Sequence, residues 1–503
     1  MLKKILTEDW LLIGGALALL VILRWNSFGV PFERDEGEYA YSAWLMSRGG
    51  VLYKDAFLQK PPLIVYTYWF GQLLTKTGLW PARMLALMSA TGVILATSLV
   101  IAKKFGRRAG LVGFSLLPIM LSFPYFMGLS ANTEIFMLLP LMGVVLIYIW
   151  FGEKAKLSYW VLAGGLASLA LLYKPICLFV LIWVFGVWVF KSRNFKGVFF
   201  AIVSALSVLL LVMLPVILSG GWSYFWEEAV VFNGLYAKSW GFGFTNLFRQ
   251  LWVMLSKWWV LVIPMVWFFL QKYKNWWFWV GLVLAGFMGV YQTPIGHYYL
   301  MLMPFLVVVA SVGLVKFMDD IGQKYYWGLL IAVLVMLIPV RSQLAKTPEE
   351  INLWVYGTAN PFFEAPLVAQ KLAEVTDSDN KVFVAGSEPE ILYYAKRESV
   401  SRFVITYPLI IETPKRLDYQ KEIIGELEKE KPTVIVYSTK QHSGLWNEES
   451  PKEFIDYLRS LIDSEYEMVG GYVWEINKGY WITEFEEGDL SKASLILYKR
   501  RML

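Results

Sequence analysis

Cysteine and charge are scarce in this 503-residue sequence, and each shortage excludes a class of protein. Cys177 is the only cysteine and lies within an apolar run, so the chain has neither an intrachain disulfide nor a Cys-x-x-Cys metal or redox motif. Charged residues make up only 17% of the chain, too few for an ordinary soluble enzyme. The C-terminal part carries no glycine-rich dinucleotide motif and no phosphate-binding loop, which argues against a nucleotide site there.

Apolar and aromatic residues are abundant instead: 57% of the chain is hydrophobic and 17% is aromatic, which indicates a membrane protein. Acidic residues are unevenly distributed, because 27 of the 40 lie from Leu344 onward and only 13 precede it. We therefore expect a transmembrane domain over residues 1–343 and a hydrated domain over residues 344–503. The net charge of +6 averages these two unlike parts, so it does not indicate nucleic-acid binding.

Long apolar runs alternate with short polar loops in the part that precedes Leu344. A helix needs about 20 apolar residues to cross the roughly 30 Å hydrocarbon core of a bilayer. By this measure the sequence predicts about eleven transmembrane helices, the first of which also serves as a signal anchor. The predicted spans are 10–25, 82–102, 110–127, 134–151, 158–173, 176–190, 197–219, 250–271, 276–293, 298–316 and 325–341.

Basic residues fall on alternate loops between these spans, and short loops rich in Lys and Arg stay in the cytoplasm. This rule predicts a protein of the cytoplasmic membrane with a cytoplasmic N-terminus and an external C-terminal domain. We expect surface helices in the long external loop 26–81, and we expect the Trp- and Tyr-rich loop 220–249 at the membrane interface. The clusters that define the cytoplasmic side are Lys3 and Lys4, 103–108, Lys154 and Lys156, 191–196, Lys272 and Lys274, and Lys316 and Lys324.

Short runs of β-branched residues alternate with amphipathic stretches in the C-terminal part, which predicts an α/β layered domain. The whole chain is thus expected to be a polytopic α-helical membrane protein that carries an external α/β domain. The predicted strands are 381–386, 402–407, 433–438, 472–476 and 495–498, and the predicted helices are 388–396, 414–431 and 451–462.

Eight of the 13 acids that precede Leu344 fall on the predicted outer side, and a charge near lipid is costly unless it is paired or used. The run from Glu33 to Tyr39 directly follows the first span, and a partly desolvated carboxylate there suits a general base. An ordinary solvated acidic loop explains this run equally well. The eight acids are Glu33, Asp35, Glu36, Glu38, Asp55, Glu134, Glu227 and Glu228.

Three further residues on the predicted outer side, together with Glu134, are candidates for a site. Lys60 precedes two prolines that fix the chain beside a cation suited to phosphate, although a snorkelling lysine has the same signature. Glu134 opens a span, where helix capping is an equal alternative. Lys174 ends one span and His297 begins another, and a lone histidine is more often an ordinary hydrogen-bonding residue. All four map to one predicted face, which favours a shared site.

The order of these residues along the chain resembles that of GT-C glycosyltransferases of the protein O-mannosyltransferase and aminoarabinose transferase type. The resemblance covers roughly the transmembrane part of the sequence. It is carried by Asp35, Glu36 and Tyr39 after the first span, Gln59-Lys60-Pro61-Pro62, Glu134, Lys174 and His297-Tyr298-Tyr299.

In that family the catalytic aspartate lies in the first external loop, so the resemblance implies that Asp35 is the base, with Glu36 beside it. The family's Lys-Pro-Pro motif faces the lipid phosphate, which implies that role for Lys60, helped by Lys174 and His297. The implied reaction moves a sugar from undecaprenyl- or dolichyl-phosphate to a hydroxyl of a protein, glycan or lipid acceptor, with inversion at the anomeric carbon. Further site candidates are Tyr39, Arg83, Glu134 and Tyr298.

Two positions depart from the family's pattern. The aminoarabinose type has Glu before Lys-Pro-Pro, where this sequence has Gln59, and the family more often has Asp where Glu134 stands. The metal contact that the family's Glu would make is therefore not assigned to Gln59. Binding of a divalent ion by other residues stays an open alternative. The implied reaction needs no nucleotide sugar and no redox cofactor.

A transporter or lipid flippase is the main alternative function. Such a protein would be expected to carry ionisable residues near mid-membrane on interrupted helices, whereas the charges here lie at the predicted outer boundary. A non-catalytic scaffold that presents its C-terminal domain to a partner is the second alternative, and it requires that Asp35 and Lys60 be replaceable without consequence. From its position, the C-terminal domain is expected to select the acceptor.

Overall fold

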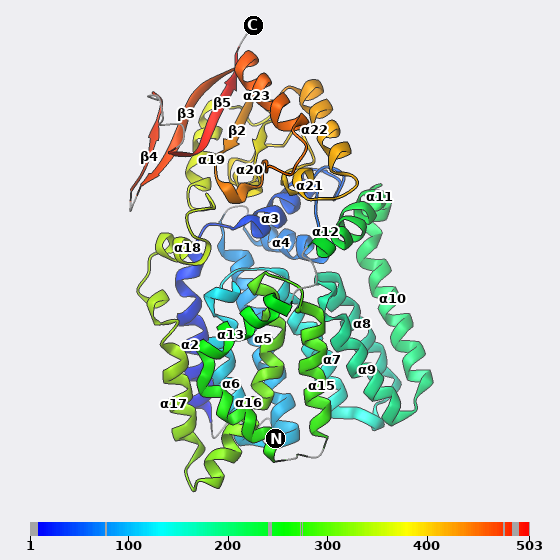
Figure 1. The fold of residues 1–503 in the computed structure, drawn as a ribbon. Helices are drawn as coiled ribbons and strands as arrows, with labels where there is room; N and C mark the ends of the chain where they lie inside the picture. Colours follow the sequence, from blue (N-terminus) through cyan, green and yellow to red (C-terminus); the bar gives the residue numbers. More distant parts are fainter. Residues whose placement is uncertain are drawn as a thin grey trace.

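A bundle of long apolar helices forms one end of the molecule, and a smaller region of helices and one β-sheet covers the other end (Figure 1). The structure, a computed structural model, describes residues 9–75, 78–239, 244–271, 273, 275–475, 478–484 and 492–501. The predicted cytoplasmic residues Lys3, Lys4, Lys272 and Lys274 lie outside the described residues, as does Ile476 at the end of a predicted strand.

Each predicted span corresponds to helical structure in the bundle. Within the described ranges, seven helical segments are long and apolar enough to cross a membrane, and shorter apolar helices accompany them. The bundle helices are α2 (Trp10–Trp25), α5 (Trp80–Phe105), α6 (Arg107–Leu121), α7 (Thr133–Phe151), α8 (Leu157–Tyr173), α9 (Leu178–Ser192), α10 (Phe195–Leu218), α13 (Phe244–Trp258) followed by α14 (Val262–Leu270), α15 (Trp276–Val290), α16 (Met303–Asp320) and α17 (Tyr325–Leu337).

Helix α6 lies inside the bundle, whereas α10 lies at its edge (Figure 1). All residues of α6 over 109–121 are buried. Helix α10 is more apolar than α6, yet it exposes large side chains such as Leu206 and Leu211. So large an apolar surface is unfavourable in water, so an apolar helix exposed in this way indicates contact with lipid.

The predicted cytoplasmic loops meet at one end of the bundle. Arg108 Nη1 lies 2.8 Å from Asp319 Oδ1, and this pair joins two of the loops. The Lys103 ammonium lies 5.3 Å from the ring centre of Trp150 at the end of α7. The predicted outer loops meet at the opposite end, below the β-sheet (Figure 1). The alternation of basic loops in the sequence therefore corresponds to two distinct ends of the bundle.

Two short helices of the first predicted outer loop, α3 (Arg34–Ser47) and α4 (Leu63–Leu74), lie between the bundle and the C-terminal region (Figure 1). Glu33 caps α3, because its carboxylate accepts hydrogen bonds from the backbone N–H groups of Asp35 and Glu36. The Glu36 carboxylate in turn accepts the N–H of Glu33, which completes a capping box. This cap fixes the first turn of α3, and Asp35 with it, at the end of the bundle.

The Trp- and Tyr-rich loop after α10 is helical along most of its length. It forms α11 (Trp222–Phe225), a π-helix (Trp226–Phe232) and α12 (Asn233–Ser239). Figure 1 places these turns beside α3 and α4, on the same end of the bundle.

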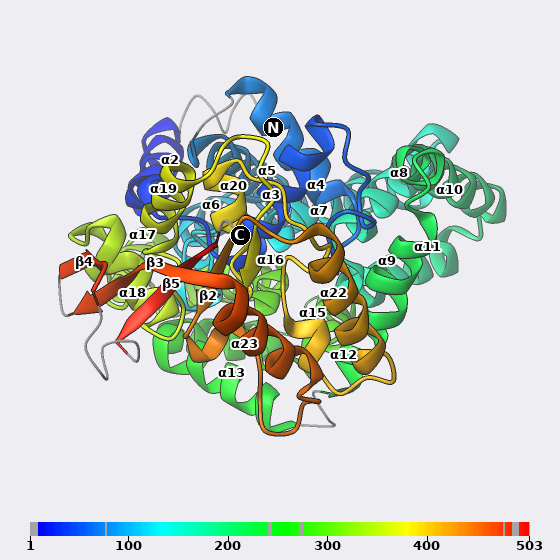
Figure 2. The ribbon, with the colours of Figure 1, turned by 90° about the horizontal axis from the view of Figure 1, so that it is seen from above.

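The C-terminal region, residues 344–503, contains a five-stranded sheet in the order β1-β2-β5-β3-β4. Strands β1 and β2 are parallel, and the other neighbours are antiparallel. Seen from above, the region lies over the end of the bundle (Figure 2). Its strands are β1 (Phe383–Ala385), β2 (Val434–Ser438), β3 (Tyr466–Glu475), β4 (Lys478–Ile482) and β5 (Ala493–Arg500), and its helices are α18 (Pro348–Tyr356), α19 (Ala365–Val375), α20 (Pro389–Ala395), α21 (Tyr407–Ile410), α22 (Arg416–Glu430) and α23 (Glu453–Glu465).

The predicted strand over residues 402–407 is wrong. The segment forms no strand, and Tyr407 begins the short helix α21. The run is apolar because Phe403, Val404 and Ile405 are buried beneath the neighbouring helices, with at most 3% of each exposed. Burial without sheet pairing gives the same sequence pattern as a buried strand. Strand β4 and helices α18 and α19 are not among the predicted elements, and the domain boundary at residue 344 remains a prediction.

Helices α8 and α10 approach each other closely at Gly164, where an added Cβ would lie 2.0 Å from the carbonyl oxygen of Ala201. That oxygen belongs to the backbone, so no side-chain movement relieves the clash. We expect Gly164→Ala to lower the free energy of unfolding by about 1–3 kcal/mol and the unfolding temperature in detergent with it. Gly186→Ala is the matched control, because nothing lies within 4 Å of its added Cβ. Equal unfolding temperatures for the two variants would contradict this packing.

Candidate active site

Asp35 and Lys60 face each other at the end of the bundle. Asp35 lies in the first turn of α3, and Lys60 lies in the extended segment that leads into Pro61 and α4. Lys60 Nζ is 3.9 Å from Asp35 Oδ1, and the two side chains keep 12% and 23% of their surface exposed, respectively. The pair is therefore desolvated on most sides but open to an incoming ligand.

Both members of this pair are charged. Burial raises the pKa of Asp35, but Lys60, His297 and Lys174 together outweigh that effect and hold the pKa below its ordinary value. Burial opposes the charge of Lys60 as well, yet Asp35 and Glu38 raise the pKa of the ammonium. The site thus presents a carboxylate free to accept a proton beside a cation able to bind an anion.

Glu134, Lys174 and His297 form a second charged cluster. Lys174 Nζ donates to Glu134 Oε1, and His297 Nε2 lies 3.5 Å from the same oxygen. The Thr133 hydroxyl donates to Glu134 Oε2 over 3.1 Å. The Lys174 ammonium also lies 3.4 Å from the ring centre of Tyr298. A carboxylate and an aromatic face therefore both stabilise the Lys174 cation inside a largely apolar bundle.

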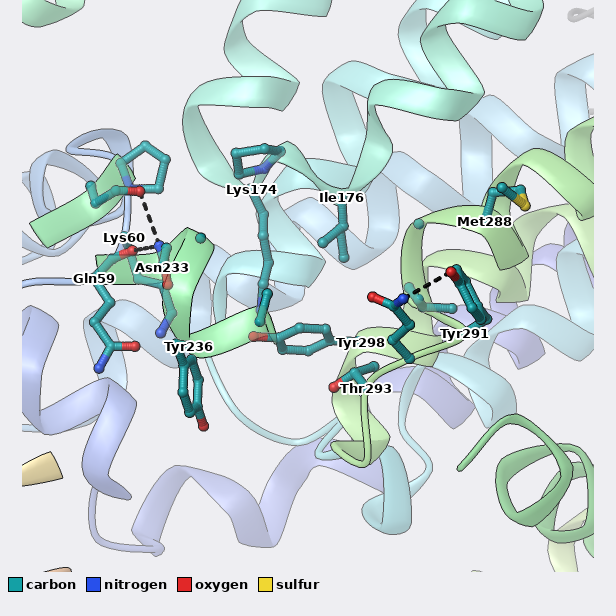
Figure 3. Close-up of a pocket in the computed structure, with 18 residues that line it drawn as sticks. Gln59, Lys60, Lys174, Ile176, Asn233, Tyr236, Met288, Tyr291, Thr293 and Tyr298 are labelled. Carbon is teal, nitrogen blue, oxygen red and sulfur yellow. Dashed lines mark hydrogen bonds between the residues drawn. The ribbon is translucent and has the colours of Figure 1, made fainter. Parts of the chain in front are cut away.

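The two lysines line one cavity of about 310 Å³ (Figure 3). Figure 3 shows Lys60 on one side of the cavity and Lys174 pointing down toward Tyr298. The lining combines polar and apolar groups, and the side away from Lys60 also carries Tyr291, Gln292 and Thr293. Other lining residues are Gln59, Asn233 and Tyr236 near Lys60, and Ile176, Met288 and Val290 toward the bundle.

An apolar groove of about 730 Å³ runs between α9 and α15 and shares Met288 with this cavity. Ile182 and Leu284 line the groove, and more than half of each side chain is exposed on the outside of the bundle. Met288 therefore lines both the cationic cavity and a neighbouring groove on the outside of the bundle. This shape suits a ligand with an anionic head and a long apolar tail.

Glu36 and Arg83 lie away from the cavity. Arg83 Nη2 is 2.5 Å from Glu36 Oε2, and at most 2% of either side chain is exposed. The other Glu36 oxygen accepts the Ala131 N–H over 2.7 Å. The pair therefore ties α3 to α5 and to the loop before α7. His297 is also absent from the cavity lining, and its Nδ1 lies 3.1 Å from Met127 Sδ.

Comparison with known proteins shows which fold this chain shares. Residues 59–218 match the family model described as dolichyl-phosphate-mannose-protein mannosyltransferase. The fold matches ArnT from Cupriavidus metallidurans bound to undecaprenyl phosphate, with a TM-score of 0.58, 12% identity and 98% of both chains covered. The chain has the GT-C fold, and residues 59–218 resemble the mannosyltransferase family.

A second match of the same fold is the archaeal oligosaccharyltransferase AglB from Archaeoglobus fulgidus, in complex with an inhibitory peptide and a dolichol-phosphate. It has a TM-score of 0.53 and 12% identity, and the match covers 95% of this chain and 75% of that chain. A search of curated protein sequences gave no match.

Glu38 lies beside the site, although the sequence reasoning did not single it out. It lies three residues after Asp35, on the same face of α3, and only 2% of it is exposed. Its Oε1 has no hydrogen-bond partner in the described part of the chain, and its carboxylate accepts the backbone N–H of Gln59. Burial raises its pKa to about 8, and nearby Lys60 offsets that rise only in part. The helical spacing from Asp35 was the available signal.

Tyr39 follows Glu38 and is fully buried, with its ring centre 5.6 Å from that of Tyr68. Within the described ranges, its hydroxyl has no hydrogen-bond partner. The described residues also contain no group of three or more His, Cys, Asp or Glu side chains arranged to hold a metal ion.

The raised pKa of Glu38 predicts a pH dependence of stability. An unfolded chain loses this proton near pH 4.3, whereas the folded protein keeps it to about pH 8. Between these values the folded state binds more protons, so the Glu38 contribution to stability falls as the pH rises. Glu38→Gln is neutral throughout and should therefore lose less stability than the wild type between about pH 5 and pH 8 in thermal unfolding. Identical pH profiles for the two proteins would contradict the burial of this carboxyl group.

Proposed function

We propose that this protein transfers a sugar from an undecaprenyl- or dolichyl-phosphate donor to an acceptor hydroxyl, by one inverting displacement on the outer face of the cytoplasmic membrane. The observation that carries the proposal is the Asp35–Lys60 pair beside a cationic cavity, with an apolar groove next to that cavity at Met288. The family match supports it, as do the lipid phosphates bound in two proteins of the same fold.

Lys60 and Lys174 would bind the phosphate of the donor. A sugar-linked phosphate carries one negative charge, and it gains a second as the sugar departs. Two ammonium groups therefore stabilise the transition state more than the bound donor, which is the condition for catalysis. Glu134 offsets part of the charge of Lys174, so that this cation is tolerated in the bundle before the donor arrives.

The polyprenyl tail would lie in the groove between α9 and α15. The groove is lined almost wholly by apolar side chains and by Gly186, beside which no atom lies within 4 Å of an ideal Cβ. Because the groove faces the outside of the bundle, a donor dissolved in the membrane reaches it sideways without leaving the lipid. Binding of the tail then supplies affinity, while the lysines fix the phosphate.

Asp35 would act as the general base. In the displacement, the acceptor oxygen forms a bond to the anomeric carbon, the bond from that carbon to the phosphate oxygen breaks, and the hydroxyl proton passes to Asp35. One displacement at one carbon inverts its configuration. An arriving phosphate competes with Asp35 for Lys60, and a weaker Lys60 contact raises the basicity of the carboxylate. Donor binding would thus activate the base.

Glu36, Arg83 and His297 would support the site without touching the donor. The Glu36–Arg83 pair holds the first turn of α3 on the bundle, and His297 orients Glu134. The comparisons give no support to a transporter or flippase. A non-catalytic scaffold would not need the Asp35–Lys60 pair, so the test below distinguishes it from an enzyme.

The test measures sugar release from a panel of radiolabelled polyprenyl-phosphate sugars by purified protein. Asp35→Asn should lower kcat by a factor of about 10²–10⁴, because the base is lost. Lys60→Ala should lower kcat and raise KM for the donor. Arg48→Met is the control, because Arg48 lies on the same helix in an exposed pair with Glu398.

Equal turnover in Asp35→Asn and the wild type would contradict the assignment of the base. A wild-type protein that neither binds nor cleaves any member of the panel would contradict the proposed donor class.

A further inference from the structure

The segment that carries Lys60 is held in place by distant parts of the chain. Residues 57–60 form neither helix nor strand, so no regular ladder fixes them. The Gln59 N–H donates to Glu38, and other backbone groups of the segment are hydrogen-bonded to four further partners. Phe57 N–H donates to Arg402 O over 2.7 Å, Leu58 N–H donates to Glu228 Oε2 over 2.8 Å, Asn233 Nδ2 donates to Gln59 O, and the Tyr53 hydroxyl donates to Lys60 O over 2.9 Å.

Arg402 provides the link to the C-terminal region. Its side chain is 5% exposed, and its Nη1 lies 2.5 Å from Glu228 Oε1. The other edge of the guanidinium binds both oxygens of Glu422, over 2.6 and 3.0 Å. Arg402 therefore contacts the segment in two ways: its carbonyl oxygen accepts the Phe57 N–H, and its guanidinium binds Glu228, which accepts the Leu58 N–H. Its guanidinium carbon also lies 5.6 Å from the ring centre of Phe57.

Glu228 is the intermediate in this chain of contacts. It is fully buried, and its two oxygens have different partners, Arg402 on one side and the Leu58 N–H on the other. It lies in the π-helix Trp226–Phe232. Single π-helical turns are rare, and they occur frequently at functional sites. The next turn carries Asn233, which binds the carbonyl of Gln59.

We propose that Arg402 is a positioning residue for Lys60, acting through Glu228 and the backbone of residues 57–58, so that the C-terminal region completes the donor-phosphate site. This role goes beyond acceptor selection, the only role that the sequence suggested for that region. The inference rests on the proposed function for the identity of the ligand, but its structural part is independent of that function.

The geometry explains why Arg suits this position. A guanidinium presents donors on several edges, so it binds Glu228 and Glu422 together, and a lysine ammonium lacks that fixed fork. Removal of the guanidinium leaves Glu228 buried without its charge partner, which is a strongly unfavourable state. The Leu58 contact is then free to shift, and Lys60 shifts with it. A misplacement of about 1 Å lowers catalytic efficiency about 100-fold in well-positioned sites.

The first measurement is hydrogen–deuterium exchange of the full-length protein in detergent, read on peptides that contain the amides of Phe57 and Leu58. Arg402→Met should exchange these amides faster than the wild type. Arg48→Met should not, although it also breaks an ion pair between α3 and the C-terminal region. Unchanged exchange in Arg402→Met would overturn the proposal. If that variant does not fold, the Arg402→Met/Glu228→Gln double variant replaces it, because it leaves no unpaired buried charge.

The second measurement is turnover of a radiolabelled polyprenyl-phosphate sugar. Arg402→Met should lower kcat/KM for the donor about 100-fold, Arg402→Lys should recover part of it, and Arg48→Met should match the wild type. Donor kcat/KM in Arg402→Met equal to that of the wild type would overturn the positioning role. If the wild type turns over no donor, the proposed function fails, and the exchange measurement alone decides whether Arg402 holds the segment.

Discussion

The ion pair between Asp35 and Lys60 is the interaction on which the rest of the site depends. An unpaired charge at the end of an apolar bundle is unfavourable, and desolvation offsets much of the attraction within a buried pair. Two such charges therefore persist only where the surroundings fix both side chains. Here Asp35 lies on the capped helix α3, and Lys60 lies on an extended segment whose backbone is hydrogen-bonded to distant residues. The pair is thereby kept nearly in contact while staying open to an anion from the cavity.

Other buried pairs form the frame around it. The Glu36–Arg83 pair holds α3 on the bundle, and the Arg402–Glu228 pair holds the Lys60 segment under the C-terminal region. Buried pairs of this kind contribute little net stability, since desolvation offsets much of their attraction. Their use here is geometric, because each of them fixes one member of the Asp35–Lys60 pair. The bundle and the C-terminal region thus both position the residues of the site.

The sequence was most informative where a signal is local. Apolar runs predicted the bundle helices, and basic loops predicted which ends of the helices meet. On that basis Asp35, Lys60 and Glu134 were expected on one face, and the structure places them there, while their catalytic roles stay predictions. Glu38 had a local signal in its helical spacing from Asp35, whereas the role of Arg402 could not be read in advance, because its partner Glu228 lies 174 residues away in sequence. The run 402–407 was mistaken for a strand for the same reason: its burial comes from tertiary contacts.

The most direct test of the account is an experimental structure of the protein with a polyprenyl phosphate bound. The account predicts that the phosphate lies within hydrogen-bonding distance of both Lys60 Nζ and Lys174 Nζ, beside Asp35, with the tail between α9 and α15. A phosphate bound away from the two lysines, or a tail in the apolar groove lined by Leu11, Ala16 and Tyr326 on the other side of the bundle, would contradict it.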